Sequence, residues 1–192
     1  IPEIQRVFVS TDSEDIAEVA KKHSAIIIER PTELATDESP EWHSWQHAAD
    51  WVENQYGDFD TFICLPATSP LRNRSDVERC MKLLNEDTDC VIGITESRVN
   101  PWFNMVQIGR GGYLEKIRTA EKPVFRRQDA PKSFDITTAA YVTRKKFILS
   151  NSGIFDGRVK GIEIPQRRAL DIDTLVDFEY AEYLLANKLS DL

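Results

Sequence analysis

The chain has 192 residues, of which 41% are hydrophobic and 29% charged, which is enough apolar material for the core of one domain. Its 24 Lys and Arg against 32 Asp and Glu give a net charge of −8, with no basic run of five residues. This balance excludes a typical binder of the nucleic-acid backbone. No apolar stretch approaches the roughly 20 residues that cross a bilayer, and no secretory signal is evident, so we expect a cytoplasmic protein without membrane contact.

The first half of the chain alternates predicted strands with predicted helices. The apolar run Thr61 to Leu65 is typical of a parallel strand covered on both faces. This alternation predicts an α/β fold whose sheet is mostly parallel, with right-handed crossovers. The expected strands are 7–10, 26–28, 61–65 and 90–95, and the expected helices run from Asp12 or Ser13 to about 22, from Ser39-Pro40-Glu41 to 57, and from a Ser75 to Glu78 capping box onward.

The alternation breaks between Glu96 and Phe134. A hairpin is predicted over 105–117, followed by a polar stretch, and such an excursion is typical of a lid, a binding loop or an oligomer arm. A strand over 136–142, a short helix over 144–149, an extended piece over 161–165 and a helix from Thr174 to about Lys188 complete the chain. The apolar stripes of the first and last helices, including Ile16, Val19, Leu175 and Phe178, are expected to face the core.

Asp171 and Asp173 are the strongest chemical candidates. Side chains two residues apart in an extended segment point the same way, so both carboxylates can face one hard cation such as Mg²⁺. In the alternative interpretation, Asp173 caps the last helix and Asp171 lies in solvent.

Several polar side chains follow predicted strands, where ligands bind in open α/β sheets. The turn PATSPLR offers the hydroxyl of Thr68 and the guanidinium of Arg72, although it also fits a loop that only starts a helix. Arg127 and Gln128 suit an anionic substrate or a solvated surface, and Arg30 suits a base or a phosphate. The three cysteines form no CxxC pair and are expected to be buried reduced thiols.

Five motifs in order resemble the cytidylyltransferases that activate acidic sugars, with the nearest likeness to the CMP-N-acylneuraminate synthetase family. Each motif is weak alone, but together they span about residues 6 to 185. They are VFVSTDSEDIAEVA, ERPTELATDESP, CLPATSPLR, FRRQDAP and LDIDTLVDFEYAE.

This resemblance implies a Rossmann-like nucleotide-diphospho-sugar transferase fold and a single domain over 1–192 that couples CTP to a 2-keto-3-deoxy sugar acid and releases pyrophosphate. It implies a homodimer formed through an inserted dimerisation or lid segment over 98–134. The implied site residues are Asp171 and Asp173 for Mg²⁺ and catalysis, Arg30, Thr36 and Ser39 for the nucleotide, and Thr68, Arg72, Arg127, Gln128 and Tyr141 for the sugar.

The sequence departs from the family pattern in three places. Pro66 replaces a usual Gln and Phe103 stands where some relatives carry Lys, which together predict an acidic sugar other than N-acetylneuraminate. The family's first strand and Gly- and Lys-bearing phosphate loop have no counterpart from Ile1 onward, so the chain is expected to be most of a domain. The alternatives are a Kdo-type or other sugar nucleotidyltransferase, and a noncatalytic sugar-binding or dimerisation module.

Overall fold

A computed structural model describes residues 1–189, and its centre is a four-stranded sheet with the strand order β3-β7-β4-β8. β7 runs antiparallel to both β3 and β4, whereas β4 and β8 are parallel, so the prediction of a mostly parallel sheet was wrong. The strands are β3 (Thr61–Cys64), β4 (Cys90–Glu96), β7 (Phe134–Arg144) and β8 (Val159–Glu163).

The direction of β7 follows from how the chain reaches it. Parallel neighbours need a crossover, usually through a helix, but β4 and β7 are joined by the excursion over 97–133, which turns the chain back beside its own start. Since β3, β4 and β8 all run the same way, their carboxyl ends lie on the same side of the sheet, which we call the carboxyl edge. That edge is where an α/β sheet positions ligands.

An irregularity in the β4–β7 pairing lies close to this edge. Ile92 pairs with Tyr141 but Gly93 pairs with Thr137, so residues 138–140 bulge out of the ladder. Gly93 cannot carry a side chain, because a Cβ there would lie 2.6 Å from Thr137 Oγ1 and 2.8 Å from the Cδ1 of Ile164. Bulges of this kind re-aim side chains near functional sites.

A separate pair of parallel strands, β1 (Phe8–Thr11) and β2 (Ile26–Glu29), is joined by the helix α1 (Glu14–Lys22). Ser13 caps α1 by accepting a hydrogen bond from the backbone of Ile16, as predicted. The expected burial of the α1 stripe was wrong, because Ile16 is 53% exposed. The spacing predicts an apolar face correctly but does not say what covers it.

The long helix α2 (Glu41–Tyr56) connects the two sheets through aromatic side chains. Trp45 packs against Tyr141 of β7 in the main core, with ring centroids 5.1 Å apart. Near the other end of α2, Trp51 meets Phe8 of β1. The expected hydroxyl cap at Ser39 is absent, since α2 begins after Pro40 without a side-chain cap.

Two further helices cover the main sheet. α3 (Arg74–Leu83) packs against β7 and β4, and α4 (Lys145–Ser150) packs against α2. The capping box of α3 is formed by Asn73 and Asp76 rather than by Ser75 and Glu78. The helix therefore starts earlier than predicted, because Asn73 is an equally good cap and precedes the serine.

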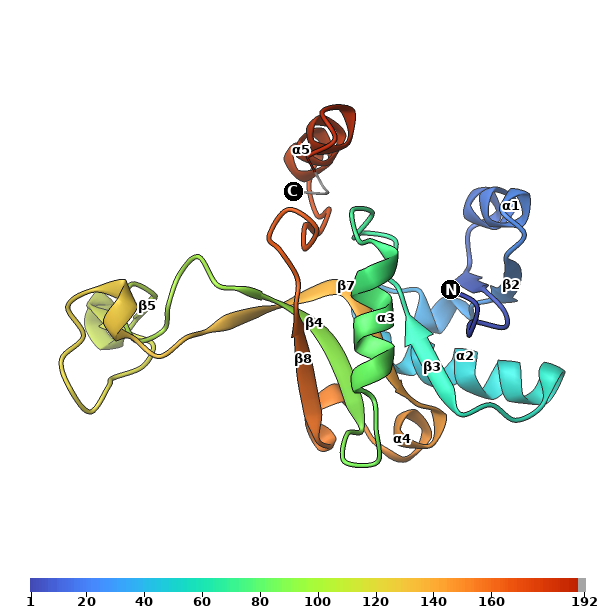
Figure 1. Cartoon of the computed structure of the whole chain (residues 1–192), viewed down its shortest axis with the longest axis horizontal. Coiled ribbons are helices and arrows are strands. Elements are labelled where there is room, and N and C mark those ends of the chain that lie inside the picture. Colours follow the sequence, from blue (N-terminus) through green and yellow to red (C-terminus); the bar gives the residue numbers. More distant parts are fainter. Residues whose placement is uncertain (190–192) are drawn as a thin grey trace.

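The excursion forms the predicted hairpin, β5 (Val106–Ile108) paired antiparallel with β6 (Leu114–Lys116). Figure 1 shows this hairpin reaching well away from the main sheet, at the left of the view. Several of its large apolar side chains are exposed; Ile108 and Tyr113, for example, are each 77% exposed. The hairpin thus presents apolar surface on an extended arm.

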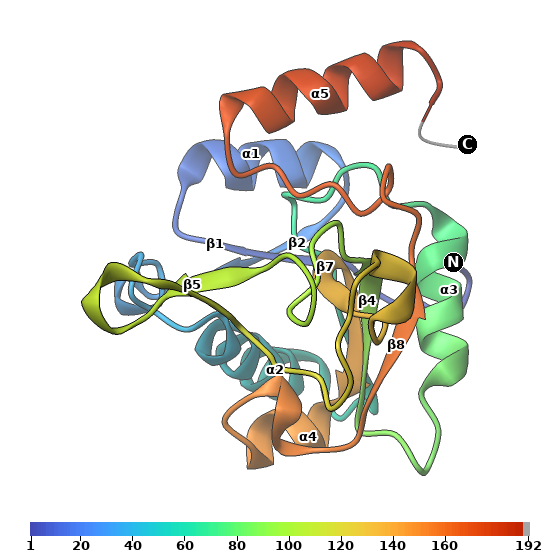
Figure 2. The same cartoon turned by 90° about the vertical axis from the view of Figure 1, so that its left-hand side faces the viewer.

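The last helix, α5 (Leu175–Ala186), lies above α1 in Figure 2. Ala181 and Leu184 are buried, but Leu175 and Phe178 are 70% and 50% exposed, so their expected inward orientation was wrong. Among residues 1–189, no helix combines the length and the apolar character of a membrane span.

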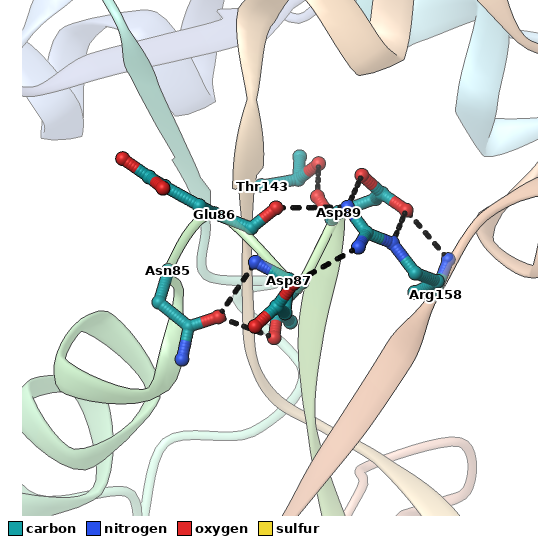
Figure 3. A network of polar contacts seen from close by, with 7 residues as sticks. Asn85, Glu86, Asp87, Asp89, Thr143 and Arg158 are labelled. Atoms are coloured by element: carbon teal, nitrogen blue, oxygen red, sulfur yellow. Dashed lines mark hydrogen bonds and ion pairs between the residues drawn. The ribbon is translucent and has the colours of Figure 1, made fainter.

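The amino-terminal ends of β4 and β8 are joined by a polar network. The guanidinium of Arg158 bonds both carboxylate oxygens of Asp89 and also donates to the carbonyl of Glu86 at 2.9 Å, while Thr143 donates to the Asp89 carbonyl at 2.8 Å (Figure 3). This cluster lies on the side of the sheet opposite to the carboxyl ends of β3, β4 and β8, which we call the amino-terminal edge.

Candidate active site

The loop after β3 and the segment after β8 are bound to each other at the carboxyl edge of the sheet. The backbone N–H of Ile172 donates to the carbonyl of Thr68 at 2.8 Å. The hydroxyl of Ser69, which is fully buried, bonds Leu170 O at 3.0 Å and the Thr138 hydroxyl at 2.7 Å. Two motifs that were considered separately in the sequence, PATSPLR and LDID, are thereby brought together.

Asp171 lies between these two tethers, and its charge acts on both Arg72 and Tyr141. Its Oδ1 is buried and has no hydrogen-bond partner, and the Nε of Arg72 is in the same state. Burial lowers the pKa of Arg72, while the nearby acidic groups of Cys64 and Asp171 oppose this shift. Arg72 and Asp171 are thus a cation and an anion near each other, and each has one buried polar atom without a hydrogen-bond partner.

Tyr141 supplies a neutral hydroxyl to the same group of side chains. It is 6% exposed, and burial raises its pKa to about 12, with further contributions from Glu41, Cys64 and Asp171. At neutral pH this hydroxyl keeps its proton and can act as a hydrogen-bond donor. Thr68, by contrast, is exposed at the rim of the loop.

Asp173 does not cap the last helix. The cap of α5 is Thr174, which forms a reciprocal capping box with Asp177, and only the backbone N–H of Asp173 joins it, at 3.3 Å from Asp177 Oδ2. The side chain of Asp173 is exposed. The interpretation in which these two acids serve only as a cap and a solvated residue was therefore wrong.

Two residues of this cluster were not predicted as site residues. Cys64 ends β3 directly opposite Tyr141, and its Sγ lies 3.8 Å from Oε1 of Glu41. Burial raises the pKa of the Cys64 thiol, and the Glu41 charge adds to the effect, so it remains protonated and is a poor nucleophile. The position of Cys64 just before the PATSPLR loop was the available signal, whereas Glu41 comes from α2 and no local pattern linked it to β3.

A second recess lies beyond β4 and β8 at the same edge. Arg127 lines it and donates to the backbone carbonyl of Arg98, and both Arg127 and Gln128 are exposed on a short turn, Arg127–Asp129. The recess has a volume of about 270 Å³ and is lined by Thr95, Glu96, Ser97, Arg98, Arg127, Glu163, Ile164, Pro165 and Gln166.

The predicted nucleotide residues lie after β2, in the segment that leads from the β1–β2 sheet to α2. Arg30 follows β2 and donates to Ser10 through its Nη2, 2.6 Å from the backbone carbonyl, and through its Nε, 3.2 Å from the hydroxyl. Thr36 and Ser39 form a turn in which the Ser39 N–H donates to Thr36 O at 3.0 Å. No hydrogen bond or ion pair described for residues 1–189 joins these three to Asp171, so the structure does not bring the two predicted groups into contact.

The acids at this edge fit a hard divalent cation. Mg²⁺ prefers oxygen ligands and is commonly held by one or two carboxylates, with phosphates and water completing its shell. The unpartnered buried Oδ1 of Asp171 is such an oxygen, and Asp173 adds a second, exposed carboxylate. Within the described part of the chain no group of three or more His, Cys, Asp or Glu gathers to form a complete protein cage.

These features define an α/β protein with a group of polar side chains at the carboxyl ends of its parallel strands. The fold matches the solved structure of a CMP:2-keto-3-deoxy-manno-octonic acid synthetase in complex with CTP, with a TM-score of 0.66 at 13% identity over 98% of this chain and 83% of that one. At that identity the match concerns the fold alone.

The cytidylyltransferase family matches residues 1–190, and the chain belongs to this family. It is 29% identical over 188 residues to the post-translational flagellin modification protein B of Campylobacter coli. It is also 29% identical over 187 residues to the CMP-N,N'-diacetyllegionaminic acid synthase of Campylobacter jejuni. Each match covers 96% of this chain and 78% of the relative. The resemblance to cytidylyltransferases seen in the five motifs is confirmed.

Proposed function

We propose that this protein transfers the cytidylyl group of CTP to a 2-keto-3-deoxy sugar acid of the nonulosonate type. The anomeric hydroxyl of the sugar attacks the α-phosphorus, and pyrophosphate leaves. Family membership supports the cytidylyl donor, and the named activity of the Campylobacter jejuni relative supports a nonulosonic acid as acceptor.

One observation carries the assignment of the reacting centre. Asp171 and Arg72 each keep a buried polar atom without a partner, at the edge where the strands of the sheet end. Buried polar groups are nearly always hydrogen-bonded in folded proteins. An unpaired acceptor and an unpaired donor in one group of side chains suit a ligand that carries both phosphates and a metal ion.

The remaining roles follow from charge and exposure. Asp171 and Asp173 would hold Mg²⁺, whose charge offsets that of the phosphate oxygens when it is bound. Arg72 and the protonated hydroxyl of Tyr141 are donors to an anionic acceptor, and Thr68 is at the rim. Arg127 presents an exposed planar fork suited to the carboxylate of the sugar, with Gln128 beside it.

The nucleotide is proposed to lie toward the smaller sheet, against Arg30, Thr36 and Ser39. Arg30 is held rigid by its two contacts to Ser10, which reduces the entropy lost when it binds an anion. We also propose a homodimer formed through the excursion over 98–134, because the 81% exposed Phe125 and the hairpin present apolar surface. A monomer mass in analytical ultracentrifugation would contradict the dimer.

The acceptor is best tested with purified protein, CTP, Mg²⁺ and a panel of 2-keto-3-deoxy acids that includes Kdo, N-acetylneuraminate and di-N-acylated nonulosonates. Pyrophosphate release and the CMP-sugar product would be measured together. We expect a nonulosonate other than N-acetylneuraminate to give the highest kcat/KM, since Pro66 offers no side-chain amide to the sugar.

Three results would change the proposal in different ways. N-acetylneuraminate as the best acceptor would refute the shift in specificity, and Kdo as the best acceptor would reassign the substrate. Turnover with UTP or GTP in place of CTP would refute the cytidylyl donor. Binding of the sugar acids with no turnover would favour the noncatalytic module.

A further inference from the structure

Asp76 carries a buried charge that the proposed reaction does not use. Its carboxylate is fully buried at the start of α3, where Oδ2 accepts a hydrogen bond from the backbone of Asn73 at 3.0 Å. The same carboxylate receives both arms of the Arg168 guanidinium, with Nε 2.9 Å from Oδ2 and Nη2 3.0 Å from Oδ1. The Arg168 side chain is 13% exposed.

The Asp76 carboxylate completes the capping box of α3, but that role does not require the contact with Arg168. At this position a capping box requires only a side chain that accepts a hydrogen bond from the cap backbone, and Asp177 does so on α5 with no ion pair to an arginine described. Desolvating two charges costs about as much as their attraction returns, so a buried ion pair is weak evidence of stabilisation. The two-pronged contact does fix the geometry of the pair, because it sets both the distance of the Arg168 guanidinium from the Asp76 carboxylate and the orientation of its plane.

Arg168 lies in the segment that leads from β8 to Asp171. Two other tethers fix this segment to the loop that precedes α3: the Ser69 hydroxyl bonds Leu170 O, and the carbonyl of Thr68 receives the N–H of Ile172. These two tethers hold the residues on either side of Asp171, and the Arg168 to Asp76 contact holds the segment three residues earlier. All three end on one rigid unit, α3 and its preceding loop.

We infer that the Asp76–Arg168 pair is a positioning element that holds the Asp171 carboxylate where the divalent cation binds. The inference rests on the proposed function, because it assigns a task to the pair only if Asp171 is a metal ligand. Groups that orient metal ligands without touching the metal typically cost about 10–100-fold in metal affinity or activity when they are changed.

The test uses Arg168→Lys, which keeps the charge but removes the planar fork. We expect the Mg²⁺ concentration for half-maximal turnover at saturating CTP to rise about tenfold. Turnover at saturating Mg²⁺ should recover to within about twofold of the unchanged protein, because a higher Mg²⁺ concentration refills a weakened site by mass action. Independently of activity, hydrogen exchange at the Ile172 amide should accelerate while exchange in β4 does not.

A second variant tests whether the effects of Arg168→Lys arise from misfolding. Asp76→Asn with Arg168→Gln leaves no buried charge without its counterion and retains hydrogen-bonding groups on both sides. We expect the same rise in the Mg²⁺ requirement and the same faster exchange at Ile172. The matched control is Arg158→Lys, which alters a two-pronged contact to Asp89 at the opposite edge of the sheet and should change neither readout.

The possible outcomes separate this inference from the proposed function. If Asp171→Asn changes the Mg²⁺ requirement but neither Arg168 variant does, the positioning role is overturned and the metal assignment stands. If Asp171→Asn leaves the Mg²⁺ requirement unchanged, the metal assignment fails, and the positioning role fails with it. A change in the Arg168 variants that Arg158→Lys reproduces would show a general loosening and would also overturn the inference.

Discussion

The two edges of the main sheet treat their polar groups in opposite ways. At the amino-terminal edge of β4, Arg158 and Asp89 satisfy each other and the neighbouring backbone. At the carboxyl edge, Asp171 and Arg72 are near each other yet each keeps an atom that nothing satisfies. The polar groups of the first edge are thus satisfied within the fold, whereas those of the second leave atoms open to a ligand. Variants at the two edges should therefore separate activity from stability.

The largest effect is expected from Asp171→Asn at the carboxyl edge. Removing this charge should lower kcat by about 10²–10³-fold, the usual loss when one electrostatic contact to the reacting centre is removed. The thermal midpoint should stay the same or rise, because the variant no longer holds a partly buried charge with an unpartnered oxygen. Steady-state kinetics and calorimetry on the same preparation measure both.

Glu179→Gln is the matched control for this variant, since Glu179 is an exposed acid on α5. It should leave kcat within about twofold, because the charges of exposed groups are strongly screened. If Asp171→Asn retained full turnover, the carboxyl edge would lose its assignment as the reacting centre.

An intermediate effect is expected from Ser69→Ala. This change leaves the carbonyl of Leu170 and the hydroxyl of Thr138 without their buried partner, which should cost about 1–3 kcal/mol of unfolding free energy. Urea denaturation followed by circular dichroism measures the loss. The exposed Ser75 is the control, and Ser75→Ala should change stability by less than about 0.5 kcal/mol. Equal stability of the two variants would show that Ser69 does not join the loop to the 170–172 segment.

The smallest effect is expected from Arg158→Gln, and it should depend on pH. Hydrogen bonds from Arg158 hold the pKa of Asp89 below its ordinary value. The ionised Asp89 therefore adds stability above about pH 4, and this contribution is lost as the pH falls through the lowered pKa of the folded state. Arg158→Gln should be less stable than the unchanged protein at neutral pH, with a difference that shrinks in acid. Urea midpoints across the pH range test this, and a constant difference would contradict it.

The sequence predicted the order of helices and strands well, because the spacing of apolar residues within each segment indicates its type. Ser13 as a helix cap and the hairpin at 105–117 were both confirmed. The direction of β7 was not predictable in the same way, since an apolar strand reads alike in both directions. The caps at Ser39 and Ser75 were wrong because several polar residues in a row could each begin the helix, and only packing chooses among them.

In the candidate site, too, residues could be predicted from neighbouring sequence, whereas contacts between distant segments could not. Asp171 and Arg72 follow strands and could be found from that position alone, whereas Glu41 reaches Cys64 from another helix across the fold. Tyr141 was assigned through family resemblance, and its altered acidity depends on burial that no short pattern encodes. Exposed apolar stripes on α1 and α5 were predicted as patterns, but what faces them is set by tertiary structure.

The excursion that reverses the direction of the chain before β7 also affects how this fold can change in evolution. β4 and β7 pair across residues 97–133, and the free energy needed to close a flexible loop grows only slowly, by roughly 0.6 kcal/mol for each doubling of its length. Insertions and deletions in this arm therefore cost the sheet little. The arm carries Arg127 and borders the recess beyond β4, so changes in the arm can reshape this recess while the pairing of the main sheet is kept.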